Sequence, residues 1–232
     1  PLQDAMSRIP SSPTTDKWSI EEAKRTYHID RWGLSYFDID EEGRVVARPR
    51  PDNGGATIRL TDIIDEARER NLRTPLLIRF QDILRHRVQT INAAFAKAIS
   101  EYEYRGSYRG VFPIKVNQLR EVVEEVLIAG ESHQTGLEVG SKPELFAALA
   151  LHEQLGSLII CNGYKDEAYI RMALLGQKMG KTVVLVVEKM EELDPIVAVS
   201  RSMGVKPILG VRVKLWSKAD GKWAASGGEN AK

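Results

Sequence analysis

Residues 108–119 read YRGVFPIKVNQL, and this stretch decides the fold of the chain. The β-forming run from Val111 to Ile114 ends abruptly at Lys115, and a polar turn containing Asn117 leads into a helix-like pattern. A lysine at the carboxyl end of a buried parallel strand lies where an α/β barrel keeps its chemistry. The neighbouring residues are apolar, which favours the uncharged amine and therefore a nucleophile able to form a Schiff base. The stretch predicts a parallel α/β fold in which Lys115 is catalytic, although a lysine can also simply end a strand and face solvent.

The alternation of strand and helix continues on both sides of this stretch. We expect strands centred on Ile78, Val111, Leu137, Ile159, Val184 and Val211, and helices near residues 61–71, 81–103, 118–129, 143–154, 166–178 and 190–203. Such alternation indicates βα units and a parallel sheet. Six strands could complete an open doubly wound sheet, whereas a closed barrel needs eight. Because no closing helix follows the last strand, we expect an incomplete (β/α)8 barrel of about six strands within a longer polypeptide.

The first sixty or so residues follow a different pattern. Residues 1–17 predict a loose arm, and residues 18–32 predict one amphipathic helix with a capping box at its start, formed by Ser19 and Glu22. Two alternating segments, 34–40 and 44–48, predict a β-hairpin. A connector rich in proline and glycine follows. We therefore divide the chain into an arm, helix and hairpin at residues 1–60 and a truncated barrel at residues 61–232.

Composition narrows the class of protein. Hydrophobic residues make up 43% of the chain and charged residues 28%, which is ordinary for a globular protein. A formal net charge of +1 gives no reason to expect nucleic acid or an acidic membrane as a partner. No apolar stretch approaches the roughly 18 residues that a membrane helix needs. The single cysteine, Cys161, fits a reducing cytoplasm, and the four scattered histidines lack metal-ligand spacing, so we expect no metal ligands.

Polar residues follow two further strands of the predicted sheet. Glu138 ends an apolar strand and is expected to face the same mouth as Lys115; alternatively, it is a strand-end carboxylate that pairs with Lys142. Ser141 and Glu144 form a capping-box pattern, so we interpret Ser141 as structural.

The next strand leads into a tight turn at Asn162 and Gly163, which either contacts a ligand or merely joins strand to helix. Cys161, just before the turn, has no basic neighbour and is interpreted as a buried apolar residue.

Arg212 lies among β-forming residues of the last predicted strand. An arginine in such surroundings is costly to bury without a carboxylate or phosphate partner. It is expected either to point into the barrel and support Glu138, or to extend between barrel and helix with its charged end in water.

Five strings of the sequence resemble the biosynthetic arginine decarboxylase family: YFDID, YRGVFPIKVNQ, GLEVGSKPEL, CNGYKD and GKWAASGGE. That family consists of pyridoxal-phosphate enzymes with an alanine-racemase-type barrel and belongs to the ornithine, diaminopimelate and arginine decarboxylase superfamily. The resemblance implies that Lys115 holds the cofactor aldehyde and that Glu138 pairs with the protonated pyridine nitrogen. It also implies cofactor contacts from Arg212 and Asn117. Asn230 and Ala231 replace the Lys-Ser that is usual in the last string, a mild departure.

The resemblance further implies that the parent protein converts L-arginine to agmatine and carbon dioxide in polyamine biosynthesis. It implies a homo-oligomer in the cytoplasm with a possible need for Mg²⁺, and residues 1–60 that join a C-terminal β-domain absent from this chain. The chain alone is expected to be inactive. Two alternatives remain, namely a non-catalytic homologue that regulates a partner decarboxylase and a decarboxylase of the same fold for diaminopimelate, ornithine or lysine. The presence of both Lys115 and Glu138 argues against the first.

Overall fold

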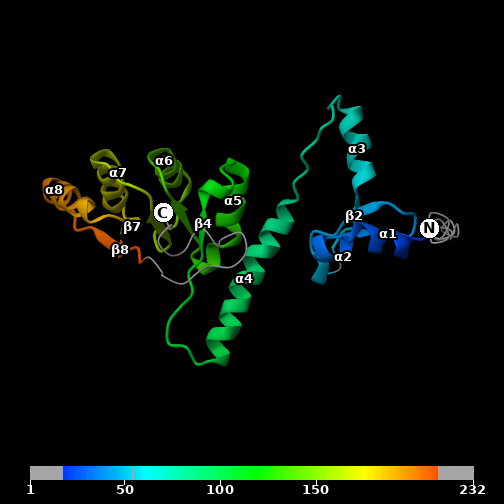
Figure 1. Ribbon diagram of the computed structural model, residues 1–232, viewed down its shortest axis with the longest axis horizontal. Coiled ribbons are helices and arrows are strands. Elements are labelled where there is room, and N and C mark those ends of the chain that lie inside the picture. Colours follow the sequence, from blue (N-terminus) through cyan, green and yellow to red (C-terminus); the bar gives the residue numbers. More distant parts are fainter. Residues whose placement is uncertain (1–17, 54, 214–232) are drawn as a thin grey trace, which may run out of the picture. The chain divides into compact units, whose positions relative to one another are not determined.

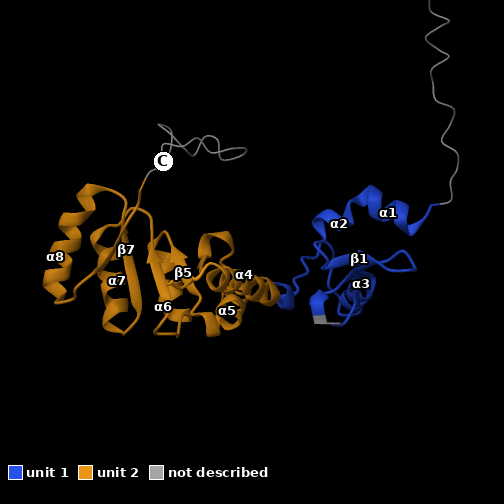
Figure 2. Cartoon of the chain, turned by 90° about the horizontal axis from the view of Figure 1, so that it is seen from below, with its two compact units in different colours: residues 1–83 blue, residues 84–232 orange. Residues whose placement is uncertain are grey.

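The computed structural model describes residues 18–53 and 55–213. The chain forms two compact units, which meet in sequence between Ile83 and Leu84 (Figure 2). The predicted arm at residues 1–17 and the string GKWAASGGE lie outside the described residues.

The first unit contains a small antiparallel sheet and several short helices. Its strands are β1 (Phe37–Ile39), β2 (Val45–Ala47) and β3 (Ile58–Arg59), and its helices are α1 (Ile20–Tyr27), α2 (Ile29–Trp32), the 3-10 turn η2 (Pro51–Asn53) and α3 (Leu60–Glu69). The predicted hairpin is confirmed, because β1 pairs with β2 in antiparallel register. The sequence did not predict β3, which pairs with the far edge of β2.

The helix predicted over residues 18–32 is two helices rather than one. It begins as expected, because the Ser19 hydroxyl accepts a hydrogen bond from the Glu22 amide at 3.1 Å. It breaks at His28, whose backbone adopts the left-handed conformation with φ of 50°. The amide of His28 bonds back to carbonyls of α1 and so caps that helix, and α2 begins at the next residue, Ile29.

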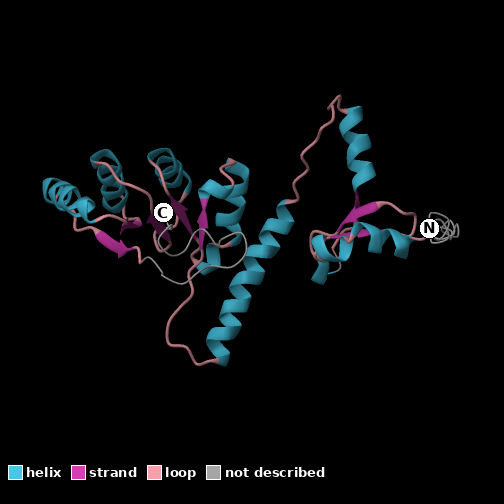
Figure 3. Cartoon of the chain, viewed as in Figure 1, coloured by secondary structure: helices cyan, strands magenta, loops and turns pink. Residues whose placement is uncertain are grey.

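The second unit is built from consecutive strand-and-helix pairs. After the long helix α4 (Gln81–Glu101), which begins just before the boundary, come β4 (Val111–Pro113), η3 (Ile114–Val116), α5 (Arg120–Ala129), η4 (Glu131–His133), β5 (Gly136–Val139), α6 (Lys142–Leu151), β6 (Leu158–Cys161), α7 (Glu167–Lys178), β7 (Thr182–Val187), η5 (Met190–Glu192), α8 (Leu193–Met203) and β8 (Ile208–Val211). The five strands form one sheet in sequence order, and every neighbouring pair is parallel (Figure 3). This confirms the α/β class and the parallel, partial-barrel arrangement.

Alternation along the strands gives the sheet a buried face and a more open one. Alternate residues of the strands, such as Leu137, Ile159 and Leu185, are almost completely buried in one core with side chains of α5 to α8. These helices lie along that same face of the sheet (Figure 1). Residues that point the other way, such as Ile160 and Val186, are only partly buried.

The strand predicted at Leu77 and Ile78 is wrong, so the sheet has five described strands rather than six. Residues 75–80 form no regular structure, and Leu77 is 78% exposed. An apolar dipeptide becomes a strand only when another strand satisfies its backbone groups, and β4 pairs with β5 alone among the described strands. The assignment of residues 61–83 to the barrel remains a prediction.

None of the described helices combines the length and the apolar character needed to cross a membrane.

We predict that the sheet core carries much of the stability of the second unit. Ile159→Ala removes a fully buried side chain from the central strand and should lower the free energy of unfolding by about 2–5 kcal/mol. The matched control is Ile128→Ala on the outer side of α5, where 61% of the residue is exposed and a change below about 0.5 kcal/mol is expected. Urea unfolding of the whole protein measures both. Equal effects at the two positions would contradict the assignment of the core.

Candidate active site

The carboxyl ends of the five parallel strands meet at one edge of the sheet and surround an open cleft of about 760 Å³. Polar residues from all five strand ends line the cleft: Lys115, Glu138, Asn162, Glu188 and Arg212. The sequence had suggested four of these five as possible site residues. Glu188 was missed, although it directly follows the six-residue strand β7 and could have been found by the same rule of strand ends.

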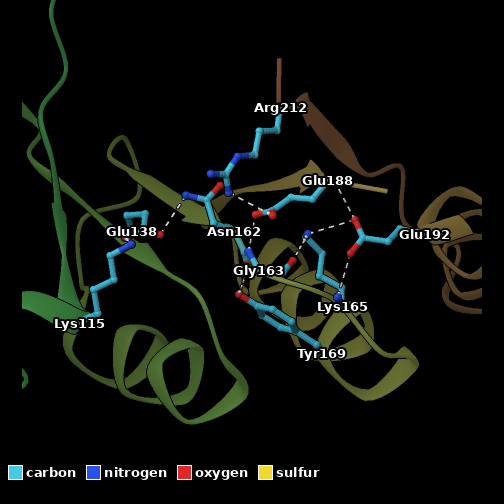
Figure 4. A network of polar contacts seen from close by, with 9 residues as sticks. All are labelled: Lys115, Glu138, Asn162, Gly163, Lys165, Tyr169, Glu188, Glu192 and Arg212. Carbon is cyan, nitrogen blue, oxygen red and sulfur yellow. Dashed lines mark hydrogen bonds and ion pairs between the residues drawn. The ribbon is translucent and has the colours of Figure 1, made fainter. Parts of the chain in front are cut away.

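Lys115 and Glu138 face each other across this cleft, as expected (Figure 4). The 3-10 turn η3 carries Lys115 just beyond β4, and its Nζ lies 3.9 Å from Oε2 of Glu138. The other oxygen of Glu138 accepts a hydrogen bond of 2.9 Å from the side-chain amide of Asn162. The alternative pairing of Glu138 with Lys142 is not formed, because Lys142 pairs with Asp166.

The expected apolar surroundings of Lys115 are not found. Its side chain is 66% exposed, whereas that of Glu138 is only 10% exposed. The reason is that Lys115 extends past the end of β4 toward the open side of the cleft. In the described part of the chain this amine therefore lies near a carboxylate and is not enclosed by apolar side chains.

The turn after β6 requires glycine at position 163. Gly163 has φ of +76°, and a Cβ atom there would lie 2.4 Å from the carbonyl oxygen of Gly140. Its amide donates a hydrogen bond of 2.6 Å to Oε1 of Glu188, and its carbonyl accepts one of 2.6 Å from Nζ of Lys165. The turn therefore does more than connect strand to helix, since it places the side chain of Asn162 against Glu138.

Arg212 lines the cleft, but its carboxylate partner is not the expected one. Its guanidinium lies 3.1 Å from Oε2 of Glu188, and 57% of its side chain is exposed. The prediction that Arg212 supports Glu138 from inside the barrel is therefore not met. Glu188 stands at the end of β7, the strand directly beside β8, which makes it the nearer carboxylate to Arg212.

Asn117 serves a local purpose in the described structure. Its side-chain oxygen accepts a hydrogen bond of 3.1 Å from the amide of Leu119, just before α5. It is not among the residues that line the cleft.

A buried ion pair behind the cleft was not predicted from the sequence. Nζ of Lys165 lies 3.3 Å from Oε2 of Glu192, and both side chains are almost completely buried. Burial favours the neutral form of Glu192, but hydrogen bonds from the amides of Glu188 and Lys165, together with the Lys165 ammonium, hold the pKa of its carboxyl below the usual value. The carboxylate is therefore charged in the folded protein near neutral pH.

Cys161 and Tyr169 belong to the packing beneath the cleft. Burial raises the pKa of the Cys161 thiol to about 12, which confirms the interpretation of this residue as an apolar one without thiolate character. The hydroxyl of Tyr169 lies 3.2 Å from the carbonyl oxygen of Asn162 and so helps to fix the turn.

Comparison with known proteins identifies the family of this chain. Residues 88–232 match the family model described as pyridoxal-dependent decarboxylase, pyridoxal binding domain. The chain belongs to this family. The matched segment contains Lys115 and every other residue that lines the cleft.

Curated relatives extend the similarity to nearly the whole chain. The biosynthetic arginine decarboxylase of Nostoc sp. is 49% identical over 93% of this chain, and that of Bacteroides thetaiotaomicron is 48% identical over 93%. The chain spans only 32% and 34% of the length of these two relatives.

Solved structures also resemble this chain in fold. The crystal structure of the biosynthetic arginine decarboxylase from Campylobacter jejuni superposes with a TM-score of 0.71 at 32% identity, covering 80% of this chain and 30% of that one. Diaminopimelate decarboxylase from M. jannaschi gives a TM-score of 0.57 at 16% identity, covering 82% of this chain and 38% of that one, and shows the fold alone.

We predict that the buried pair makes the protein sensitive to acid. Glu192→Gln leaves Lys165 without a charged partner and should cost about 3–5 kcal/mol of unfolding free energy near neutral pH. Because the folded-state pKa of Glu192 is lowered, its contribution is complete above the unfolded pKa of about 4.3 and is lost as the pH falls through the folded value. Urea unfolding of wild type and variant from about pH 7 to about pH 3 should therefore show a shrinking difference.

The matched control is Glu167→Gln, which breaks an exposed pair with Arg171 and should change stability by at most about 1 kcal/mol. A difference between wild type and Glu192→Gln that stays constant over the whole pH range would show that Glu192 is not a charged partner.

Proposed function

We propose that the whole protein is a pyridoxal-phosphate-dependent decarboxylase that converts L-arginine to agmatine and carbon dioxide. The observation that carries the proposal is the pairing of Lys115 with Glu138 at the mouth of a parallel sheet, in a chain of the pyridoxal-binding family. The substrate is proposed from the relatives from Nostoc sp. and Bacteroides thetaiotaomicron, both of which are named biosynthetic arginine decarboxylases.

The residues of the cleft fit the cofactor chemically. Pyridoxal phosphate, when bound, supplies an aldehyde that condenses with amines and a ring that accepts the electron pair left when carbon dioxide departs. Lys115 would provide an accessible primary amine to hold the aldehyde, and this amine would be the leaving group when the amine of the substrate takes its place. Asn162 orients Glu138, whose negative charge would favour protonation of the cofactor. We propose that the protonated atom beside this carboxylate is the pyridine nitrogen.

Arg212 would supply positive charge to the same cleft. Its pairing with Glu188 orders the guanidinium at the mouth of the cleft, where it could bind an anionic group of cofactor or substrate. We retain Asn117 as a proposed cofactor contact, although its side chain is engaged in the turn before α5.

Further features remain proposals drawn from the family resemblance. They comprise a homo-oligomeric assembly, a cytoplasmic location, a role in polyamine biosynthesis and a requirement for Mg²⁺. Among residues 18–53 and 55–213, no group of three or more His, Cys, Asp or Glu side chains could hold a metal ion.

We predict that Lys115→Ala in the whole protein abolishes the visible absorption band of bound pyridoxal phosphate. Release of carbon dioxide from carboxyl-labelled L-arginine should fall by roughly 1000-fold or more, because the covalent holder of the cofactor is lost. Lys97→Ala, at an exposed lysine that pairs with Glu101 of the same helix, should retain both the band and the activity.

A panel of L-arginine, L-ornithine, L-lysine and diaminopimelate then tests the substrate. A band that survives Lys115→Ala would contradict the proposed cofactor site. An intact band with release from another amino acid in preference to L-arginine would contradict only the proposed substrate, and a band without release from any of them would favour the regulatory homologue.

A further inference from the structure

The backbone of Gly163 is held on both sides by charged side chains. Its amide donates to Oε1 of Glu188 at 2.6 Å, and its carbonyl accepts from the ammonium of Lys165 at 2.6 Å (Figure 4). Hydrogen bonds between an ionised group and the backbone are stronger than those between neutral groups. This clamp therefore fixes the turn after β6 more firmly than an ordinary loop.

The buried pair of Lys165 and Glu192 ties the turn after β6 to the turn after β7. One oxygen of Glu192 accepts from the backbone amide of Lys165 at 2.9 Å, and the other accepts from the backbone amide of Glu188 at 3.0 Å. The same carboxylate also lies 3.3 Å from the Lys165 ammonium, whose side chain has no exposed surface. Glu192 thus fixes the backbone of the very residue, Glu188, that holds the amide of Gly163.

The clamp is connected directly to the pair that carries the proposed chemistry. Asn162 precedes Gly163, and its side-chain amide donates to Oε1 of Glu138 at 2.9 Å. The remaining oxygen of Glu138 is the one that lies 3.9 Å from Nζ of Lys115. A rotation of the peptide at Gly163 would therefore move Asn162 and release Glu138 from its orientation beside Lys115.

We propose that Glu188, Lys165 and Glu192 are positioning residues that clamp the Gly163 turn and, through Asn162, hold the Glu138 carboxylate beside Lys115. This inference rests on the proposed function, because it assigns these residues to cofactor binding at the same cleft. A buried ion pair is a poor choice for stability alone, since well-packed apolar residues often stabilise as much or more. The contacts described for the Lys165 ammonium and the Glu192 carboxylate hold the turns that border the cleft, as positioning requires.

Two substitutions of Glu188 in the whole protein separate the clamp from the ion pair with Arg212. Glu188→Ala removes the acceptor for the Gly163 amide, whereas Glu188→Gln keeps a carbonyl acceptor on a side chain of the same length. Both substitutions remove the charge that pairs with Arg212. Lys165→Met tests the carbonyl side of the clamp. Leu174→Ala, at a fully buried residue of α7 outside this network, is the control for destabilisation alone.

For each folded variant we would measure the melting temperature, the dissociation constant of pyridoxal phosphate, and the pH midpoint of the visible band of the bound cofactor. Glu188→Ala and Lys165→Met should weaken cofactor binding by roughly tenfold, as expected for the loss of one charge-assisted hydrogen bond. They should also shift the pH midpoint of the cofactor band to a lower value. The reason is that the Glu138 carboxylate, which favours the protonated form of the cofactor, is no longer held in place. Glu188→Gln, which keeps a neutral acceptor for the Gly163 amide, should give clearly smaller shifts than Glu188→Ala, and Leu174→Ala should lower only the melting temperature.

Three results would overturn the inference. A lower melting temperature in Glu188→Ala, with the dissociation constant and the midpoint unchanged, would make the network purely structural. Equal shifts in Glu188→Ala and Glu188→Gln would show that the effect passes through Arg212 instead of Gly163. Wild-type protein without any visible band would remove the proposed function, and this inference with it. If Lys165→Met does not fold, the two Glu188 variants decide.

Discussion

Parallel pairing of β4 to β8 is the constraint on which the candidate site depends. Because all five strands run in the same direction, the residues that follow them are brought to one edge of the sheet. Lys115 and Arg212 are nearly one hundred positions apart in the sequence, yet both line the same cleft. One face of the same sheet packs against α5 to α8 and forms the apolar core. The sheet that stabilises the unit therefore also positions the polar groups of the cleft.

The charges of the cleft are not equally engaged. Glu138 is held by the amide of Asn162, and Glu188 is held by Gly163 and Arg212. Lys115, by contrast, is largely exposed, and its ion pair with Glu138 is long at 3.9 Å. A tightly bound ammonium would have to break strong contacts before reacting. The loose contact at Lys115 therefore suits its proposed role, in which the amine condenses with an aldehyde and is later replaced by a substrate amine.

Local patterns in the sequence predicted local structure well. The helix N-caps predicted at Ser19 and Ser141 are both formed, because each hydroxyl needs only an amide three positions further on. The regular spacing of apolar segments predicted β4 to β8 and their helices, because alternation of this kind has few folded solutions. The strand expected at Ile78 failed because its formation depends on a partner strand that no local pattern reveals. The left-handed conformation of His28, which splits the first helix, likewise leaves no periodic signal in the sequence.

The sequence indicated which residues belong to the site better than it indicated which of them pair with one another. Strand-end logic indicated that Lys115 and Glu138 share a mouth, and the structure places them there. The choice of Glu188 over Glu138 as the partner of Arg212 depends on which strands are neighbours and on how far each side chain extends. The exposure of Lys115 depends on which parts of the molecule cover the cleft. The apolar residues next to Lys115 in the sequence do not reveal this.

The most direct test is to trap the cofactor on the protein. Reduction of the whole protein with borohydride in the presence of pyridoxal phosphate, followed by proteolysis and mass spectrometry, locates the lysine that carries the cofactor. The account predicts a single pyridoxyl adduct on the peptide containing Lys115. Attachment to another lysine, or the absence of any adduct, would contradict it.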